Sequence, residues 1–287
     1  QVDSMLVIWP DNTIEKKYDI TVNQTLELSP SENRQKVDNL EIFAKSKTCF
    51  QKVEALSGLD YKHQENRFID FNHQRLIPYK TSDRGPAVVV KDLDGNGSDD
   101  IFFGGAKSQP AKIFLQTGNG FLEKQTDAIA NDSLREDVSA IIEDLNNDGK
   151  NDLFIVSSGG ELSEQNDALL DRLFINEDKG FKKQALPPYF ENGAVVKAHD
   201  YNKDGNIDLF VGSGAVANDF GQLPKSYLLN NKNGSFETVD NKTLENVGMV
   251  TDAVWTDFDG DEWVDLIVVG EWMTPRFFKN QEGILKD

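Results

Sequence analysis

One alternation of apolar and polar segments recurs four times along the chain. In each unit a short apolar run precedes a nine-residue polar loop that begins and ends with Asp, and a second apolar run follows. The first unit has these parts at 87–91, 92–100 and 101–105. Short apolar runs bounded by Asp, Asn and Gly predict strands, so each unit begins as strand, acidic loop and strand. The units recur in steps of 52, 56 and 57 residues, counted between the first residues of the acidic loops, which are Asp92, Asp144, Asp200 and Asp257.

The second half of each unit predicts two further strands. After a variable loop, an aromatic-rich run such as 113–116 precedes a short polar stretch with Gly and then an apolar residue, which is a hairpin signal. Four antiparallel strands in about 50 residues are typical of a propeller blade. Helical periodicity is nearly absent, although 161–172 could hold a short helix. We therefore predict an all-β fold, a β-propeller of four-stranded antiparallel blades with at least four blades in 82–287, the last one incomplete.

The acidic loops have the composition of calcium-binding loops. Side-chain oxygens at loop positions 1, 3, 5 and 9 and the backbone carbonyl at position 7 can converge on one ion. Hard oxygen donors without His or Cys suit Ca²⁺ and not Zn²⁺, so we expect up to four structural Ca²⁺ ions. The expected ligands are Asp92, Asp94, Asn96, Ser98, Asp100; Asp144, Asn146, Asp148, Lys150, Asp152; Asp200, Asn202, Asp204, Asn206, Asp208; and Asp257, Asp259, Asp261, Trp263, Asp265, where Ser98, Lys150, Asn206 and Trp263 offer their carbonyls.

Position 6 of the loops separates the fourth from the others. Gly97, Gly149 and Gly205 permit the positive φ that wraps a loop inward, whereas the fourth loop has Glu262. A residue other than Gly costs about 1 kcal/mol in that conformation, so the fourth site is expected to be distorted. The alternative for all four loops is a set of turns built from turn-favouring residues, with no metal.

Charge and composition narrow the classes of function. The chain of 287 residues has 30 Lys+Arg against 49 Asp+Glu, a net charge of −19, which disfavours nucleic acid and anionic membrane surfaces as partners. The four acidic loops hold 15 of these acids and two lysines, so most of the net charge lies in the expected metal sites. No apolar run approaches the roughly 18 residues of a membrane span, so no direct membrane insertion is expected. The one cysteine, Cys49, excludes an internal disulfide.

The acidic loops, followed by 101–105 and its counterparts, resemble FG-GAP (VCBS-type) repeats, the blades of the integrin α-subunit propeller. The resemblance covers 82–287. It implies a calcium-stabilised propeller whose ions lie in the loop joining the first two strands of each blade. It also implies seven blades in the intact domain.

The N-terminal part resembles a different family. The run 2–11, with Trp9-Pro10, and the run 22–28 are similar to the end of the ASPIC/UnbV domain. We therefore expect the end of this β module at 1–30, a linker at 31–47 and propeller entry strands at 48–81. The architecture resembles large surface proteins of Bacteroidetes-type bacteria. This implies a secreted or cell-surface location, periplasmic or outer-membrane-associated if bacterial, for a piece of a longer protein.

The sequence favours recognition over catalysis. His63, His73 and His199 are far apart, and no nucleophile or phosphate-binding motif is present. The variable loops leave each blade opposite the acidic loops, and Phe220 and Trp272 in them are candidates for contact with a protein or glycan, although Trp272 could instead pack between blades. We expect a non-catalytic recognition or adhesion module. The alternative is a glycan-active enzyme, a lyase or hydrolase, which a cluster of His, Tyr, Arg and acids would favour.

Overall fold

The computed structural model describes residues 2–32, 34–36, 57–163 and 165–287. The chain divides into two compact units, Gln1–Glu54 and Ala55–Asp287. Most of the expected linker, the first expected entry residues and Cys49 lie outside the described residues. No helix in the described part is long and apolar enough to span a membrane.

The smaller unit is a three-stranded antiparallel sheet in the order β1-β2-β3. Its strands are β1 (Val2–Ile8), β2 (Thr13–Ile20) and β3 (Gln35–Lys36). The β1–β2 turn is closed by the Trp9 N–H, which donates to the Thr13 carbonyl at 2.9 Å. Asp11 accepts the Thr13 hydroxyl proton at 2.6 Å and pairs with Arg34 at 2.9 Å. Strand β3 lies where the sequence predicts linker, and it pairs with the start of β2.

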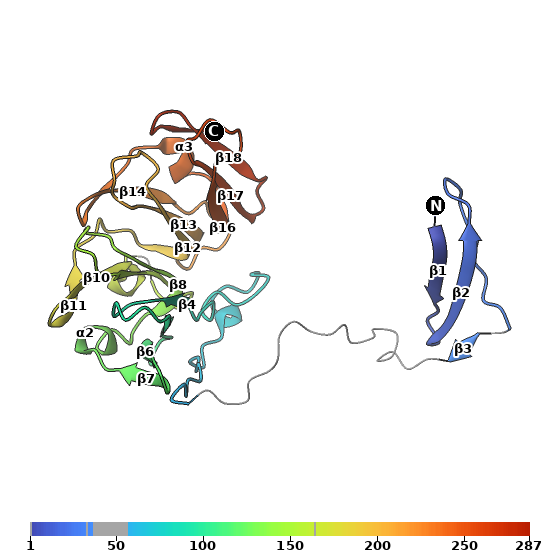
Figure 1. The fold of residues 1–287 in the computed structure, drawn as a ribbon, viewed down its shortest axis with the longest axis horizontal. Helices are drawn as coiled ribbons and strands as arrows, with labels where there is room; N and C mark the ends of the chain where they lie inside the picture. The colour runs from blue at the N-terminus through green and yellow to red at the C-terminus, as the bar shows by residue number, and fades with distance from the viewer. Residues whose placement is uncertain (1, 33, 37–56, 164) are drawn as a thin grey trace. The chain divides into compact units, whose positions relative to one another are not determined.

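The larger unit contains, in its described residues, four four-stranded antiparallel sheets, one for each repeat in the sequence (Figure 1). The prediction of an all-β chain with repeated four-stranded antiparallel sheets is therefore confirmed. The strands are β4 (Val88–Lys91), β5 (Asp100–Phe103), β6 (Lys112–Thr117), β7 (Gly120–Lys124); β8 (Glu136–Glu143), β9 (Asp152–Ser158), β10 (Arg172–Glu177), β11 (Gly180–Gln184); β12 (Glu191–His199), β13 (Asp208–Val216), β14 (Tyr227–Lys232), β15 (Ser235–Thr238); β16 (Met249–Thr256), β17 (Asp265–Glu271), β18 (Arg276–Asn280) and β19 (Leu285–Lys286). Short helices are η1 (Asp70–Asn72), α2 (Asp127–Ala130), η2 (Asp167–Leu169) and α3 (Lys242–Glu245), and η2 falls within 161–172.

The four sheets pack face to face in chain order, as blades do. The first strands β4, β8, β12 and β16 contact one another in that order. Side chains that alternate along β9 enter two different cores: Leu153 packs with residues of the first sheet, and Phe154 packs with residues of the third. Strand β9 is accordingly buried at every position, and β13 at all but its last. Strand β17 is buried on one face only. Leu266 and Val268 are buried on that face, while Val269, on the other face, is exposed.

Residues 57–86, here called the crossing segment, run over the variable loops of all four sheets. We expected entry strands at 48–81, but the described residues 57–81 form no strand and contain only η1. Gly160 lies so close to this segment that a Cβ would be 2.1 Å from the Thr81 hydroxyl, so only Gly fits there. The segment contacts the four variable loops in the order of the chain. The Gln64 N–H donates to Gln109 at 2.7 Å, and the Asn66 amide donates to Glu161 at 2.9 Å. Gln74 then accepts the Phe220 N–H at 2.9 Å, and the Tyr79 hydroxyl donates to Glu271.

Candidate metal-binding loops and the opposite face

The four acidic loops follow one backbone course. The first Asp of each accepts the N–H of position 6, as Asp92 does from Gly97 at 2.8 Å and Asp257 from Glu262 at 2.9 Å. The prediction of positive φ at position 6 is confirmed, with Gly97 at 83° and Glu262 at 70°. Position 4 is also left-handed in all four loops, which sequence reasoning missed because only two of its residues are Gly. These residues are Gly95, Asn147, Lys203 and Gly260.

Position 9 anchors each loop to the third strand of its own sheet. These four carboxylates are fully buried, and each accepts a backbone N–H from the third strand, as Asp152 does from Asn176 at 2.8 Å. Three of them also accept the N–H of position 2, the exception being Asp208. The corresponding N–H of Tyr201 donates to the His199 carbonyl instead, so Asp208 Oδ2 is buried without a hydrogen-bond partner. The position-9 residues are Asp100, Asp152, Asp208 and Asp265.

Two of the position-9 carboxylates, Asp152 and Asp208, lie in surroundings that disfavour an uncompensated negative charge. Burial, with the nearby Asp148 and Asp144, raises the pKa of Asp152 to about 6 even though two backbone N–H groups lower it. Burial, with Asp204 and Asp200, raises the pKa of Asp208 to about 7. A divalent cation among these oxygens would stabilise the ionised form.

The donor set of the loops fits a calcium ion. The carboxylates of Asp92, Asp94 and Asp100 bring oxygens within 4.8 Å of one another, and so do those of Asp257, Asp259 and Asp265. The second and third loops have Asn at position 3, where an amide oxygen is also a suitable donor. At positions 3 and 5 the side-chain oxygens curl inward onto the loop backbone, accepting N–H groups two residues ahead. Examples are Asn202 from Asp204 at 2.9 Å and Asp204 from Asn206 at 2.9 Å.

The fourth loop carries a cation of its own. The Lys279 amine pairs with Asp259 and lies 3.1 Å from an oxygen of Asp261. Hydrogen bonds to these two carboxylates raise the pKa of Lys279 above its ordinary value. An ion entering this loop must compete with Lys279 for two of its expected ligands, so the fourth loop differs from the others by this lysine as well as by Glu262.

An Asn at the end of the third strand ties each loop to its neighbour. Asn231 donates to the Leu145 carbonyl in the second loop at 2.7 Å and to the Ile207 carbonyl in its own loop at 2.9 Å. Asn176 and Asn280 make the equivalent pairs of bonds. Any ion that orders one loop therefore also orders the interface between sheets.

Asn231→Ala is expected to lower the free energy of unfolding by about 2–3 kcal/mol. Two buried carbonyls lose their donor, and each unsatisfied buried group costs about 1–3 kcal/mol. The matched control is Asn230→Ala, which removes one part-buried bond to Asn202. Urea unfolding in the presence of calcium measures both variants, and equal losses would contradict the role assigned to Asn231.

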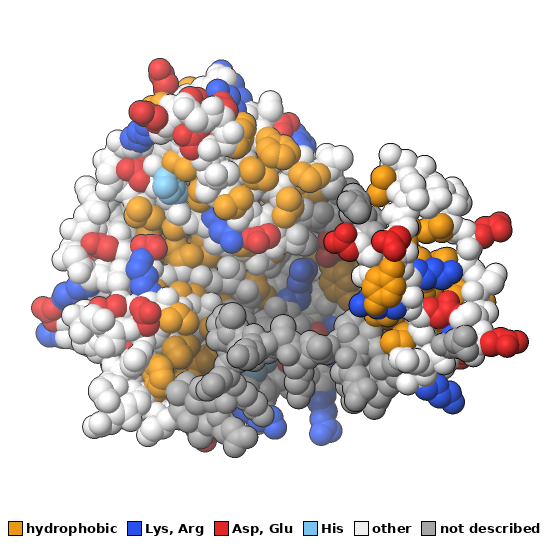
Figure 2. Space-filling model, turned by 45° about the vertical axis from the view of Figure 1, so that its right-hand side comes forward, with side chains coloured by type: hydrophobic (Ala, Val, Ile, Leu, Met, Phe, Trp, Pro, Cys, Tyr) orange, Lys and Arg blue, Asp and Glu red, His pale blue; other side chains and the backbone are white. Residues whose placement is uncertain are grey.

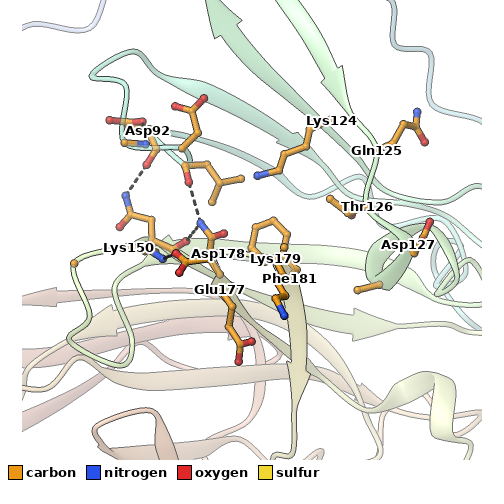
Figure 3. Close-up of a pocket in the computed structure, with 18 residues that line it drawn as sticks. Asp92, Lys124, Gln125, Thr126, Asp127, Lys150, Glu177, Asp178, Lys179 and Phe181 are labelled. Atoms are coloured by element: carbon orange, nitrogen blue, oxygen red, sulfur yellow. Dashed lines mark hydrogen bonds and ion pairs between the residues drawn. The ribbon is translucent and has the colours of Figure 1, made fainter.

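A cavity of about 800 Å³ lies beside the first acidic loop, between it and the second sheet (Figure 3). Asp92 and Asp94 line one side, and Lys150 and Phe181 line the other. The Asn151 amide crosses to the Asp92 carbonyl at 2.6 Å, and Lys150 pairs with Asp178. The cavity is thus bordered by the contacts that join the first two loops.

The opposite face carries an aromatic cluster, which we define as Tyr79, Phe220 and Trp272. The Phe220 ring meets Trp272 edge-on at 5.5 Å between centroids and Tyr79 edge-on at 5.6 Å. Trp272 is 74% exposed, so it projects into solvent and does not pack between sheets. The Arg84 guanidinium lies 5.6 Å from the Tyr79 ring centroid, and the Tyr79 hydroxyl donates to Glu271. Tyr79 comes from the crossing segment, so local sequence gave no sign of it.

Comparison with known proteins agrees with the repeat structure. The FG-GAP-like repeat family matches residues 92–155, 144–211 and 200–268, together more than half of the chain, so this chain belongs to that family. Each match runs from the first Asp of one acidic loop into the second strand of the next unit. The predicted FG-GAP resemblance is confirmed.

Curated proteins offer no match to this chain. One matching solved structure is described as the basis of specific recognition of non-reducing terminal N-acetylglucosamine by an Agrocybe aegerita lectin. It is 18% identical, with a TM-score of 0.46, and the match covers 70% of this chain and 50% of that one. This chain thus spans about half the length of that structure.

Proposed function

We propose that this chain is a calcium-stabilised, non-catalytic recognition or adhesion module of a secreted or cell-surface protein. In each acidic loop, the side chains at positions 1, 3, 5 and 9 and the carbonyl at position 7 would hold the ion. Bound Ca²⁺ would neutralise clustered carboxylates and fix the hairpin that carries them. The support is the shared loop geometry, the oxygen-only donors and the partnerless oxygen of Asp208.

The aromatic cluster is the observation that carries the recognition role. An exposed indole ring offers a flat apolar surface with a polar edge, suited to stacking on a sugar ring or an aliphatic side chain. Asp219 and Glu271 directly precede Phe220 and Trp272 in the sequence. Their carboxylates can accept hydrogen bonds from the hydroxyl groups of a glycan or from N–H groups of a protein. The ligand surface we propose combines the variable loops with the crossing segment, because Tyr79 belongs to that segment.

Trp272→Ala is expected to weaken ligand binding at least tenfold, about 1.4 kcal/mol, while leaving the melting temperature unchanged. The side chain is mostly exposed, so the fold loses little by its truncation. A glycan array and a panel of surface proteins would first find the ligand, and titration calorimetry would then compare the variants. Leu122→Ala, 64% exposed on β7 and outside both the variable loops and the crossing segment, is the control. Equal affinity of Trp272→Ala and the unmodified chain would place the binding surface elsewhere.

The exposed outer faces of the first and fourth sheets support a propeller with more than four blades. Val254, Ile267 and Phe277 are paired across the fourth sheet and share its outer face, where Val254 is 50% and Phe277 is 53% exposed. Val88 and Val90 are exposed in the same way on the first sheet. Figure 2 shows hydrophobic side chains exposed among polar ones on the face that it draws. We propose that further blades, seven in the intact domain, cover both faces.

The remaining proposals concern the protein that carries this module. The β1–β2 hairpin with its Trp9-Pro10 turn supports an ASPIC/UnbV-like module at 1–30. A large surface protein of a Bacteroidetes-type bacterium is the proposed context, and its location would be periplasmic or outer-membrane-associated. Protein or glycan is the proposed partner, and the net charge of −19 argues against nucleic acid.

A glycan-active enzyme is the second candidate function. It is favoured by a cluster of Tyr61, His63, Glu65 and Glu136 on the same side of the sheets as the variable loops. Turnover of any glycan that the module binds would decide for this candidate. Binding without turnover would support the recognition role.

A further inference from the structure

The side chains of His63, Glu65 and Glu136 converge on one point, away from the acidic loops. Each offers one ligand atom, and the three atoms lie within 4.8 Å of one another. His63 and Glu65 belong to the crossing segment and are partly exposed, with 17% and 28% of their side chains accessible. Glu136 begins β8 and is only 3% exposed. The group is therefore open on one side and anchored in the sheet on the other.

The hydrogen bonds of Tyr61 set the tautomer of His63. The Tyr61 hydroxyl donates to the Gly104 carbonyl at 3.0 Å, so towards His63 Nδ1, at 2.9 Å, it acts as the acceptor. We assign the imidazole proton to Nδ1 on this network, which leaves the Nε2 lone pair aimed at Glu65. A donating Nδ1–H and a free Nε2 is the arrangement of a metal-ligating histidine.

Two lone pairs then face each other across 2.5 Å, those of His63 Nε2 and Glu65 Oε1. Only a proton or a metal ion between them makes this arrangement favourable. Ligand atoms of a tetrahedral zinc ion lie roughly 3.3 Å apart, so an ion needs only a small opening of this pair and an approach by Glu136.

Glu136 is a buried carboxylate that no Lys, Arg or His of the described residues neutralises in an ion pair. One oxygen accepts the Gly85 N–H at 2.9 Å, and the other has no hydrogen-bond donor among the described residues. Three further acids, Glu65, Asp137 and Asp83, lie near this carboxylate. Lys107 lines the same cavity as Glu136 but pairs with Glu161 instead.

We propose that His63, Glu65 and Glu136 form a binding site for a divalent transition-metal ion, distinct from the acidic calcium loops. One imidazole nitrogen and two carboxylate oxygens suit Zn²⁺, Mn²⁺ or Fe²⁺ better than Ca²⁺, because nitrogen is a poor donor for calcium. Three protein ligands leave one position of a tetrahedral ion for water or an exogenous ligand. Tyr61 is the positioning residue, and its ring is held by stacking on Phe103 at 4.2 Å.

The test is a titration of the full chain with Zn²⁺ in millimolar calcium, which keeps the acidic loops saturated. Calorimetry is expected to show one Zn²⁺ bound per chain, with at least tenfold weaker binding in His63→Ala and in Glu136→Gln. Tyr61→Phe is expected to weaken binding about tenfold, because second-shell partners of ligating histidines have effects of that size. Co²⁺ used in place of Zn²⁺ should give a visible absorption spectrum that His63→Ala loses.

The control is His73→Ala, which removes a histidine of the crossing segment that stacks on Phe68 at 5.0 Å and lies outside the group. Glu136→Gln keeps the acceptor for Gly85, and thermal melting without zinc shows whether each variant is folded. Zinc affinity unchanged by His63→Ala, or no zinc binding in the presence of calcium, would overturn the proposal. Equal losses in His63→Ala and His73→Ala would overturn it as well, because the effect would then not depend on the group.

Discussion

Removal of calcium by EDTA is expected to lower the melting temperature of this chain by more than roughly 10 °C. An ion that binds only the folded loop contributes about 2.7 kcal/mol at a hundredfold excess over its dissociation constant. Four loops can each contribute such an amount, and 1 kcal/mol corresponds to about 2–4 °C for a domain of this size. Calorimetric melting in calcium, and in EDTA with excess magnesium, measures the shift. Superimposable curves would remove structural calcium from the proposed function.

Asp208→Asn also tests whether calcium is structural, because its effect on the melting temperature should change sign with calcium. Without calcium the substitution is expected to raise the melting temperature, because it removes a buried charge whose Oδ2 has no partner. With calcium it is expected to lower the melting temperature, because the negative charge is lost and one carboxylate oxygen becomes an NH2 group that cannot bind a cation. Asp178→Asn, at a side chain 92% exposed and outside the loops, should show neither effect. The same sign in both conditions would argue against an ion in the third loop.

The parts of this molecule that repeat were the parts that sequence could predict. Each acidic loop lies between two apolar runs, so its strands, its left-handed position 6 and its place in a four-stranded sheet follow from local pattern. At the end of the pattern, position 9 joins the loop to the third strand of its own sheet, as the Asn231 N–H does by donating to Asp208 at 2.8 Å.

The crossing segment could not be predicted, because its partners are distant in sequence. The alternation in 68–71 resembles a strand, yet Asp70 is buried and accepts four hydrogen bonds from the backbone and hydroxyl groups of Thr81 and Ser82. Those bonds hold the segment in a compact turn. Sequence analysis named Phe220 and Trp272 as candidates, but it missed Tyr79 and the His63 group, because both belong to or depend on this segment.

The interface between the first two sheets is held by a buried ionic network that the apolar strand pattern also concealed. Arg172 starts β10 and is 1% exposed. It pairs with Asp137 and lies 3.2 Å from an oxygen of Asp132. Asp137 in turn accepts the Gly105 N–H at 2.8 Å, and its backbone carbonyl accepts the Ala87 N–H at 2.7 Å. One guanidinium thus compensates the carboxylate that joins the second sheet to the first.

Arg172→Met is therefore expected to lower the free energy of unfolding by about 3–5 kcal/mol. Met fills much of the same volume, so the loss comes chiefly from leaving Asp137 buried and unpaired. Urea unfolding in calcium measures it. Lys112→Met, which breaks a half-exposed pair with Glu123 at 3.0 Å, should cost less than about 1 kcal/mol. Adding Asp137→Asn to Arg172→Met should restore part of the loss, since it removes the orphaned charge. A double variant no more stable than Arg172→Met would attribute the loss to packing instead.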